Sequence, residues 1–408
     1  MNPIGNFTDR KPQMPRRMLL FVSLGEFLGM TLWFSATAAA PAIAREFALD
    51  ATGRVWLTMA VQAGFVAGTL ITAITNLADA INARRLVAIG CIAGAAMNGA
   101  IAVAPTPGLV IALRCATGFA LAWVYPPGMK IAAGWFRERR GTALGIVVGA
   151  LTIGSAFPHL LAWLAAGAAW RMLVVTSSIL AVGAAVLVTV AVKDGPYVSA
   201  SAPFDLHAVR SVLQVRGVRL ATLGYLGHMW ELYAMWTWIA AFAAASLAGA
   251  SPSAGSLFAF IAIASGSIGC VFAGRWADEW GKARVAGAAM IVSAICAALS
   301  PLTFGAPPFV LLVLAVVWGF SVVADSAQFS ALVSEYSPRT QVGTALTLQT
   351  SAGFLLTMAS MRLVPVITAS WTWRWAFVAL VPGPLLGAWA MKRLAKLPAS
   401  SQTLNARS

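Results

Sequence analysis

Apolar runs of about twenty residues follow one another along almost the whole chain, and this pattern limits the possible folds more than any other. A helix needs about 20 apolar residues to cross roughly 30 Å of hydrocarbon. Twelve runs meet this requirement: 18–40, 54–76, 86–104, 108–135, 142–165, 170–192, 218–246, 254–274, 285–303, 308–334, 341–363 and 374–395. Charged residues make up only 10% of the 408 residues, whereas soluble domains carry about 25%. The sequence therefore predicts an all-α membrane protein with twelve transmembrane helices.

The basic residues indicate how this protein lies in the membrane. The net charge of +15 could suggest nucleic-acid binding, but that function predicts basic clusters on a polar surface. Here Lys and Arg separate the apolar runs, as the positive-inside rule describes. With both termini in the cytoplasm, the outside loops contain few basic residues, namely Arg45, Arg54, Arg171, Arg362 and Arg374. We therefore expect a multi-pass inner-membrane protein with cytoplasmic N- and C-termini and no nucleic-acid partner.

The second half of the chain repeats the first at an offset of about 200 residues. Leu24-Gly25-Glu26 recurs as Leu226-Gly227-His228, and Gly141-Thr142-Ala143-Leu144 recurs as Gly343-Thr344-Ala345-Leu346. Several matches in the same order are difficult to attribute to chance, and internal repeats of this length indicate duplicated structural units. The sequence predicts two pseudo-symmetric six-helix bundles, with this division of the chain: tail 1–17, bundle 18–192, cytoplasmic linker 193–217, bundle 218–395, tail 396–408. Residues 205–213 of the linker are either a short amphipathic helix on the membrane surface or a plain connection.

Two loop motifs are related by the same repeat. Gly274 to Arg284 reads GRWADEWGKAR, and Asn76 to Arg85 reads NLADAINARR. Both resemble the loop motif of the major facilitator superfamily, and the resemblance covers the whole chain. It implies alternating access, in which two halves rock about a solute site near the middle of the membrane.

The resemblance also implies a gating latch, in which an aspartate caps a helix end and pairs with arginine. In this sequence the pairs would be Asp79 with Arg84 or Arg85, and Asp278 with Arg275 or Arg284. A carboxylate among arginines at a helix end is a charge-assisted interaction that a rotation can break. Asn76 and Asn82 stand where the family usually has glycine.

Three acidic residues lie deep within predicted spans: Glu26, Glu231 and Asp325. The resemblance assigns helices 1, 4, 7 and 10 to a central cavity, and the three acids belong to helices 1, 7 and 10. A charge at the bilayer centre costs at least about 2.5–3.5 kcal/mol, which makes such residues functional candidates. A helical rise of about 1.5 Å per residue places all three roughly 14–18 Å from the cytoplasmic edge. We expect them to line one water-accessible cavity for proton coupling or solute binding; buried structural pairing is the alternative.

Two basic side chains accompany these acids. His228 lies one turn before Glu231 and could relay protons, because histidine titrates near neutral pH; simple packing is equally consistent with the sequence. Arg114 resembles the helix 4 arginine implicated in proton coupling in the family, or it could partner a buried carboxylate. His228, Glu231 and Met235 are too few for a metal site, so we expect no metal and no other cofactor.

Each deep acid has a tryptophan seven residues away on the same helix face: Trp33, Trp238 and Trp318. Tyr125, beside the Pro126-Pro127 pair, adds a fourth aromatic residue on the cavity helices. These rings could form an aromatic wall for a cationic or aromatic solute. Alternatively, the tryptophans belong to the aromatic belt at the membrane interface.

Residues 128–161 and 226–238 are similar to the cyanate and nitrate/nitrite permease branch of the superfamily. Nitrate porters of that branch carry an arginine inside helix 2 and inside helix 8, and this chain has neither. We therefore predict a proton-coupled transporter that imports a small organic solute and acts as a monomer, with solute, protons and the lipid bilayer as partners. The alternatives are efflux of toxic or lipophilic cations, a permease for an inorganic anion such as cyanate or nitrate, and a non-transporting sensor or assembly factor. The chain has no P-loop, G-x-S-x-G or H-E-x-x-H motif, so we predict that it is not an enzyme.

Overall fold

The structure is a computed structural model that describes residues 13–136, 139–166, 169–197, 204–205, 208–247 and 253–397. Its regular secondary structure is helical throughout these residues. Most of both predicted tails and part of the predicted linker lie outside the described residues.

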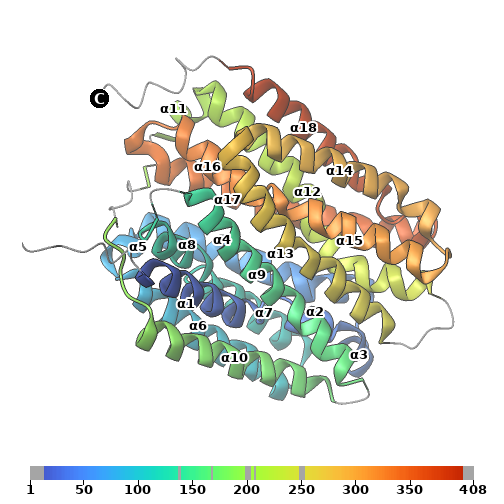
Figure 1. Cartoon of the computed structure of the whole chain (residues 1–408). Helices are drawn as coiled ribbons and strands as arrows, with labels where there is room; N and C mark the ends of the chain where they lie inside the picture. Colours follow the sequence, from blue (N-terminus) through green and yellow to red (C-terminus); the bar gives the residue numbers. More distant parts are fainter. Residues whose placement is uncertain are drawn as a thin grey trace, which may run out of the picture.

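Figure 1 shows the two halves of the chain as two groups of helices, blue to green and yellow-green to red. The first half contains α1 (Gln13–Met30), α2 (Ser35–Ala38), α3 (Ala40–Glu46), α4 (Ala51–Ile74), α5 (Leu77–Ala80), α6 (Ala83–Ala100), η1 (Ile101–Val103), α7 (Pro107–Leu121), α8 (Tyr125–Ala133), α9 (Arg140–Leu164) and α10 (Trp170–Ala191). The second half, including the end of the linker, contains α11 (Ala208–Gln214), α12 (Arg216–Ser246), α13 (Ala254–Trp280), α14 (Lys282–Thr303), α15 (Pro308–Ala324), α16 (Ser326–Tyr336), η2 (Arg339–Gln341), α17 (Val342–Ser370), η3 (Trp373–Trp375), η4 (Val378–Leu380) and α18 (Pro382–Leu394). The amphipathic stretch of the linker thus includes a short helix, α11.

All twelve predicted apolar runs are helical. Among the described residues, ten helical segments are long and apolar enough to cross a membrane. The other two predicted spans, the first and the seventh, contain α1 with 18 residues and α12 with 31 residues. Apolar side chains also cover much of the outer surface, including Val103 at 83% exposure and Phe309 at 73%. An outer surface of this kind suits lipid rather than water.

Three of the predicted spans are interrupted. The first breaks at residues 31–34, the fourth at 122–124 between α7 and α8, and the tenth at Asp325 between α15 and α16. Pro126 and Pro127 explain the break at 122–124, because proline lacks the N–H group that would continue the helical backbone hydrogen bonds. The other two breaks have no proline at the break itself.

The two halves meet along α9 and α13 and along α4 and α17, and Figure 1 shows α9 beside α13. Gly141, Gly145 and Gly149 recur every four residues on α9. A methyl group added to Gly145 would lie only 2.5 Å from the backbone oxygen of Cys270. Small residues at this spacing let two membrane helices approach closely, so glycine sets the distance between the halves here.

Candidate functional site

The second half brings three of the predicted site residues together in its interior. His228 Nδ1 lies 2.8 Å from Asp325 Oδ1, and both side chains are buried. Glu231 Oε1 accepts a hydrogen bond of 2.7 Å from the indole nitrogen of Trp318. His228 and Glu231 lie on one face of α12. Trp318 lies on α15, and Asp325 directly follows the last residue of α15. The same two helices therefore hold a histidine–aspartate pair and a glutamate–tryptophan pair.

The histidine–aspartate pair lies at a joint in the backbone. Asp325 separates α15 from α16, and its backbone oxygen accepts a hydrogen bond of 3.0 Å from the amide of Gln328. His228 Nε2 has no hydrogen-bond partner among the described residues. A buried imidazole with one nitrogen on a carboxylate can exchange a proton with it directly. The pair is thus chemically able to change charge within the membrane.

Glu26 lies apart from these residues, inside the first half. It borders a cavity of about 10 Å³ whose other lining residues, including Val22, Val87 and Val188, all belong to that half. A volume of about 10 Å³ is roughly what a single water molecule needs. The carboxylate packs against Gly128 of α8, where any added methyl group would overlap it. The predicted single cavity lined by all three acids is therefore not found in this conformation of the described residues.

Arg114 is fully buried and stabilises the break in the first span. Its Nε donates to the backbone oxygen of Leu57 at 3.0 Å, and Nη1 donates to that of Leu32 at 2.9 Å. Nη2 donates to the backbone oxygen of Trp33, and Asn98 Oδ1 lies 3.2 Å from Nη1. The interpretation of Arg114 as the partner of a buried carboxylate is wrong for the described residues, because its acceptors are neutral. The guanidinium instead binds backbone carbonyl groups, among them that of Trp33 at the break in the first span, so it positions the segment that carries Trp33.

Trp33 lies at the centre of an aromatic cluster between the two halves. Its ring centroid is 5.1 Å from Phe65 of the first half and 5.7 Å from both Tyr233 and Phe354 of the second half. Trp33 is 1% exposed and Trp318 is fully buried, so neither belongs to a membrane-interface belt. Because the rings of this cluster are in direct contact, they close the passage between the two halves at the depth of Trp33.

The other two predicted cavity aromatics are placed differently. Trp238 is half-buried; its indole nitrogen donates to the backbone oxygen of Met361 at 3.0 Å, and its ring packs against Trp373. Tyr125 is half-buried at the first position of α8. Their role as cavity residues stays a prediction.

Sequence reasoning missed a group of residues beside this cluster. Phe34 stacks on Tyr233 with 11° between the ring planes and also contacts Trp236 and His159. The indole nitrogens of Trp33 and Trp236 and both nitrogens of His159 are buried without a hydrogen-bond partner among the described residues. Buried polar atoms usually have partners, so these atoms mark a place where a polar molecule could bind. The many aromatic residues in 226–238 were the sequence feature that could have indicated this group.

Asp278 joins the two halves at the face that carries the start of α1. Its Oδ2 accepts hydrogen bonds from the amide of Thr142 at 3.2 Å and from its hydroxyl at 3.1 Å. The carboxylate thus caps the N-terminus of α9, where the helix dipole favours negative charge. The predicted pairing of Asp278 with Arg275 or Arg284 is wrong here: Arg275 lies 3.5 Å from Glu279, and Arg284 is exposed.

The matching contacts in the first half also differ from the prediction. Lys130 Nζ donates to the Asp79 carboxylate, whereas Arg84 forms an ion pair of 3.0 Å with Asp194. The predicted pairing of Asp79 with Arg84 is therefore wrong, and Arg85 is exposed.

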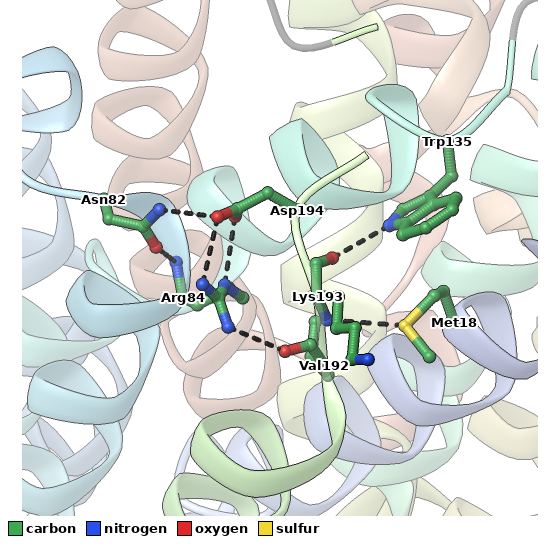
Figure 2. Close-up of polar contacts among 7 residues, drawn as sticks. All are labelled: Met18, Asn82, Arg84, Trp135, Val192, Lys193 and Asp194. Carbon is green, nitrogen blue, oxygen red and sulfur yellow. Dashed lines mark hydrogen bonds and ion pairs between the residues drawn. The ribbon is translucent and has the colours of Figure 1, made fainter. Parts of the chain in front are cut away.

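Arg84 instead fastens the beginning of the predicted linker, as Figure 2 shows. Arg84 donates to both carboxylate oxygens of Asp194 at 3.0 Å, and Asn82 donates to one of them at 2.9 Å. Burial alone would raise the pKa of Asp194, but the hydrogen bonds from Arg84 and Asn82 outweigh it and lower that pKa. Trp135 donates to the backbone oxygen of Lys193 at 2.9 Å, and the amide of Lys193 contacts Met18 Sδ at 3.3 Å. The chain leaving α10 is thus tied to α1, to the start of α6 and to the loop that follows α8.

Comparison with known proteins decides the family. The sequence pattern described as "Major Facilitator Superfamily" matches residues 22–269 and 221–408. The chain belongs to this superfamily. It is a membrane transport protein and not an enzyme, with the superfamily's fold of twelve helices in two six-helix bundles.

Curated relatives are similar over a limited region. The proline/betaine transporter of Escherichia coli strain K12 is 29% identical over 149 residues, 33% of this chain and 30% of that protein. The transporter of the same name from Salmonella typhimurium matches with the same identity and coverage. The chain therefore spans less than a third of the length of the curated relatives it matches.

Solved structures share the fold at low sequence identity. A proton:xylose symporter superposes with a TM-score of 0.71 and 14% identity, covering 93% of this chain and 95% of that one. A nucleoside transporter gives 0.67 and 15%, and the human organic anion transporter gives 0.68 and 15%, each covering 93% of this chain and 100% of the other. At these identities the likeness shows the fold alone.

Proposed function

We propose that this superfamily member is a proton-coupled secondary transporter that imports a small organic solute. The observation that carries the proposal is the buried contact between His228 and Asp325, one helical turn from the Glu231–Trp318 hydrogen bond. Ionisable groups within a membrane are costly and usually functional. Here they lie on α12 and at the α15–α16 joint, which are elements that a rocking motion would move.

The proposed coupling step is a proton transfer within this pair. A proton that moves from His228 to Asp325 across 2.8 Å converts an ion pair into two neutral groups. The electrostatic attraction between α12 and the α15–α16 joint is then lost, and the joint is free to change its angle. Glu231, held by Trp318, is the next carboxylate along the same face of α12 and the nearest acceptor on that helix for a further proton. Glu26 stays a candidate for proton binding in the first half, and Arg114 acts by holding the break in the first span.

The proposed solute site is the aromatic cluster between the halves. Trp33 and Tyr233 face each other across the interface, and the indole nitrogens of Trp33 and Trp236 lack partners among the described residues. Aromatic faces attract cationic groups, and unpaired indole donors suit a carbonyl or carboxylate oxygen. A small organic molecule with both kinds of group fits this chemistry, and the names of the curated relatives, proline and betaine transporters, are consistent with it.

The experiment reconstitutes the protein in liposomes that contain a pH-sensitive dye. Proline, betaine, an aromatic cation, nitrate and cyanate are added separately, and solute uptake is measured with and without a proton gradient. We expect an organic solute to drive proton entry in the native protein. Asp325→Asn and Glu231→Gln should lose this proton movement while exchange of labelled solute across the membrane continues. The matched control is Glu279→Gln, which removes an exposed acid whose ion pair among the described residues is with Arg275 of the same helix.

Three results would contradict the proposal in different ways. Proton movement that survives in both variants removes the acids from coupling. Transport of nitrate or cyanate alone would favour the permease branch suggested by residues 128–161, although none of the relatives named above is such a permease by name. Solute movement only out of right-side-out vesicles would favour efflux.

We also propose that the protein works as a monomer in the inner membrane with both termini in the cytoplasm. The orientation is supported by the predominance of Lys and Arg in the loops on the face that carries both termini. Labelling of single cysteines at Arg85 and Arg362 from either side of intact cells tests this orientation, because the two positions should react from opposite sides.

A further inference from the structure

A groove lined by arginine lies between α12 and α18, at the face that carries the start of α1. Its volume is about 340 Å³, and its lining residues are Arg216, Arg219, Leu220, Leu223, Trp389 and Arg393. We call it the arginine groove. It lies at the first two turns of α12 and the last turns of α18, where two membrane-spanning helices reach the level of the lipid headgroups.

The charge of the arginine groove is not neutralised by any acidic side chain that the structure describes. Arg216, Arg219 and Arg393 are all exposed, and no acidic side chain among the described residues pairs with any of them. The guanidinium of Arg393 lies 5.5 Å from the ring centroid of Trp389, a cation–π arrangement that holds it over the groove. Three like charges at one place favour an anionic ligand, and guanidinium groups match phosphate oxygens in geometry.

The other wall of the arginine groove is apolar and continues along the lipid-facing surface. Leu385, Trp389 and Arg393 follow one another at four-residue spacing on one face of α18. Leu385 is 52% exposed and Trp389 is 47% exposed. On α12, Leu223 lies one turn deeper than Arg219. The surface therefore changes from cationic to apolar in the direction of the hydrocarbon, as an amphiphilic ligand requires.

The equivalent place in the first half has a different composition. The repeat that relates Trp373 to Trp170 places Val186 and Val190 opposite Trp389 and Arg393. Val186 is 58% exposed and Val190 is 78% exposed. A helix end at this level of the membrane can therefore be purely apolar, and the charge that Arg393 adds to the arginine groove is particular to the second half.

We propose that the arginine groove binds the phosphate headgroup of an anionic phospholipid, with an acyl chain along Leu223 and Leu385. Basic pockets between spanning helices are suited to such headgroups. The lipid would hold α12, which carries His228 and Glu231, against α18 at this face of the membrane. The binding itself does not depend on which solute the protein transports.

The test measures lipid retention by native mass spectrometry of the purified protein in detergent. Phosphatidylglycerol and phosphatidylcholine are titrated separately, and the native protein is compared with a variant that combines Arg216→Gln, Arg219→Gln and Arg393→Gln. Each arginine near an anionic headgroup contributes roughly fivefold, so the triple variant should lose roughly a hundredfold of its preference for phosphatidylglycerol. The matched control is Arg16→Gln with Arg17→Gln, which removes exposed charge from the same face of the first half and should leave the preference unchanged.

Two further measurements complete the test. The variant and the native protein should unfold at nearly the same temperature in phosphatidylcholine, because the three side chains are exposed and have no acidic partner among the described residues. An excess of inorganic phosphate should not displace the lipid. The proposal is overturned if the triple variant keeps its preference, if the control loses it equally, or if free phosphate displaces phosphatidylglycerol.

Discussion

The cap that Asp278 places on α9 allows a graded prediction about the balance between conformations. Both hydrogen bonds of the cap come from Thr142, at 3.2 and 3.1 Å, and they cross from one half of the protein to the other. Asparagine caps a helix about as well as aspartate, so Asp278→Asn removes mainly the charge at the helix N-terminus. That charge contributes about 0.3–1 kcal/mol. Asp278→Ala also removes the cap, for a total loss of about 1–2 kcal/mol.

These free energies convert directly into populations. A loss of one to two kcal/mol shifts a two-state equilibrium by roughly 5- to 30-fold. We therefore expect Asp278→Ala to populate a conformation in which α9 and α13 separate at this face, and Asp278→Asn to do so to a smaller extent. Spin labels at the exposed positions Arg85 and Arg339, one in each half, report this separation by electron–electron double resonance.

The control for this prediction is Glu279→Gln, which removes the same charge one residue further along. Among the described residues Glu279 forms its ion pair with Arg275 of its own helix, so its loss should leave the distance distribution unchanged. Equal distributions in Asp278→Ala and the native protein, or an equal shift in Glu279→Gln, would refute a cap that holds the halves together.

Three further predictions concern packing, burial and pH. Gly145→Leu should reduce transport at least about tenfold with the protein still folded, because the side chain fills the space between the halves; Gly183→Leu, where nothing lies within 4 Å, should transport normally. Arg114→Met should lower the thermal unfolding temperature in detergent, because the buried carbonyl of Trp33 loses its donor and an unpaired buried carbonyl costs about 1–3 kcal/mol. Arg114→Lys should not restore that temperature, because lysine lacks the planar fork of donors. The hydrogen bonds of Arg171 and Trp170 lower the pKa of Glu46. The stability that Glu46 adds is therefore present above about pH 4.3, the ordinary glutamate pKa, and is lost as the pH falls through the lowered pKa. The difference in melting temperature between the native protein and Glu46→Gln should therefore disappear in acid.

The spans and the two halves could be predicted from the sequence because membrane thickness fixes the length of each apolar run. The run predicted at 142–165 is the helix Arg140–Leu164, and similar agreement holds along the chain. The breaks in the first and tenth spans could not be predicted in the same way. They depend on partners distant in sequence, as Arg114 shows by binding the carbonyl groups of Leu32 and Trp33.

The candidate site could be predicted in its residues but not in its pairs. The cost of a buried charge singled out Glu26, Glu231 and Asp325 without any knowledge of the packing. Spacing along α12 placed His228 near Glu231, but His228 contacts Asp325 of another element. The predicted pairs of the latch were wrong for the same reason. Nearness in sequence suggested arginines of the same loop as partners of Asp278, whereas in the packed structure Asp278 caps the start of α9 in the other half.

The hydrogen bond from Trp318 to Glu231 gives the protein a built-in optical probe. Indole fluorescence responds to the charge of a group bonded to its nitrogen, so addition or removal of a proton at Glu231 should change the emission of this one residue. The difference in emission between the native protein and Trp318→Phe would then follow the transport cycle in real time, without a dye or a label.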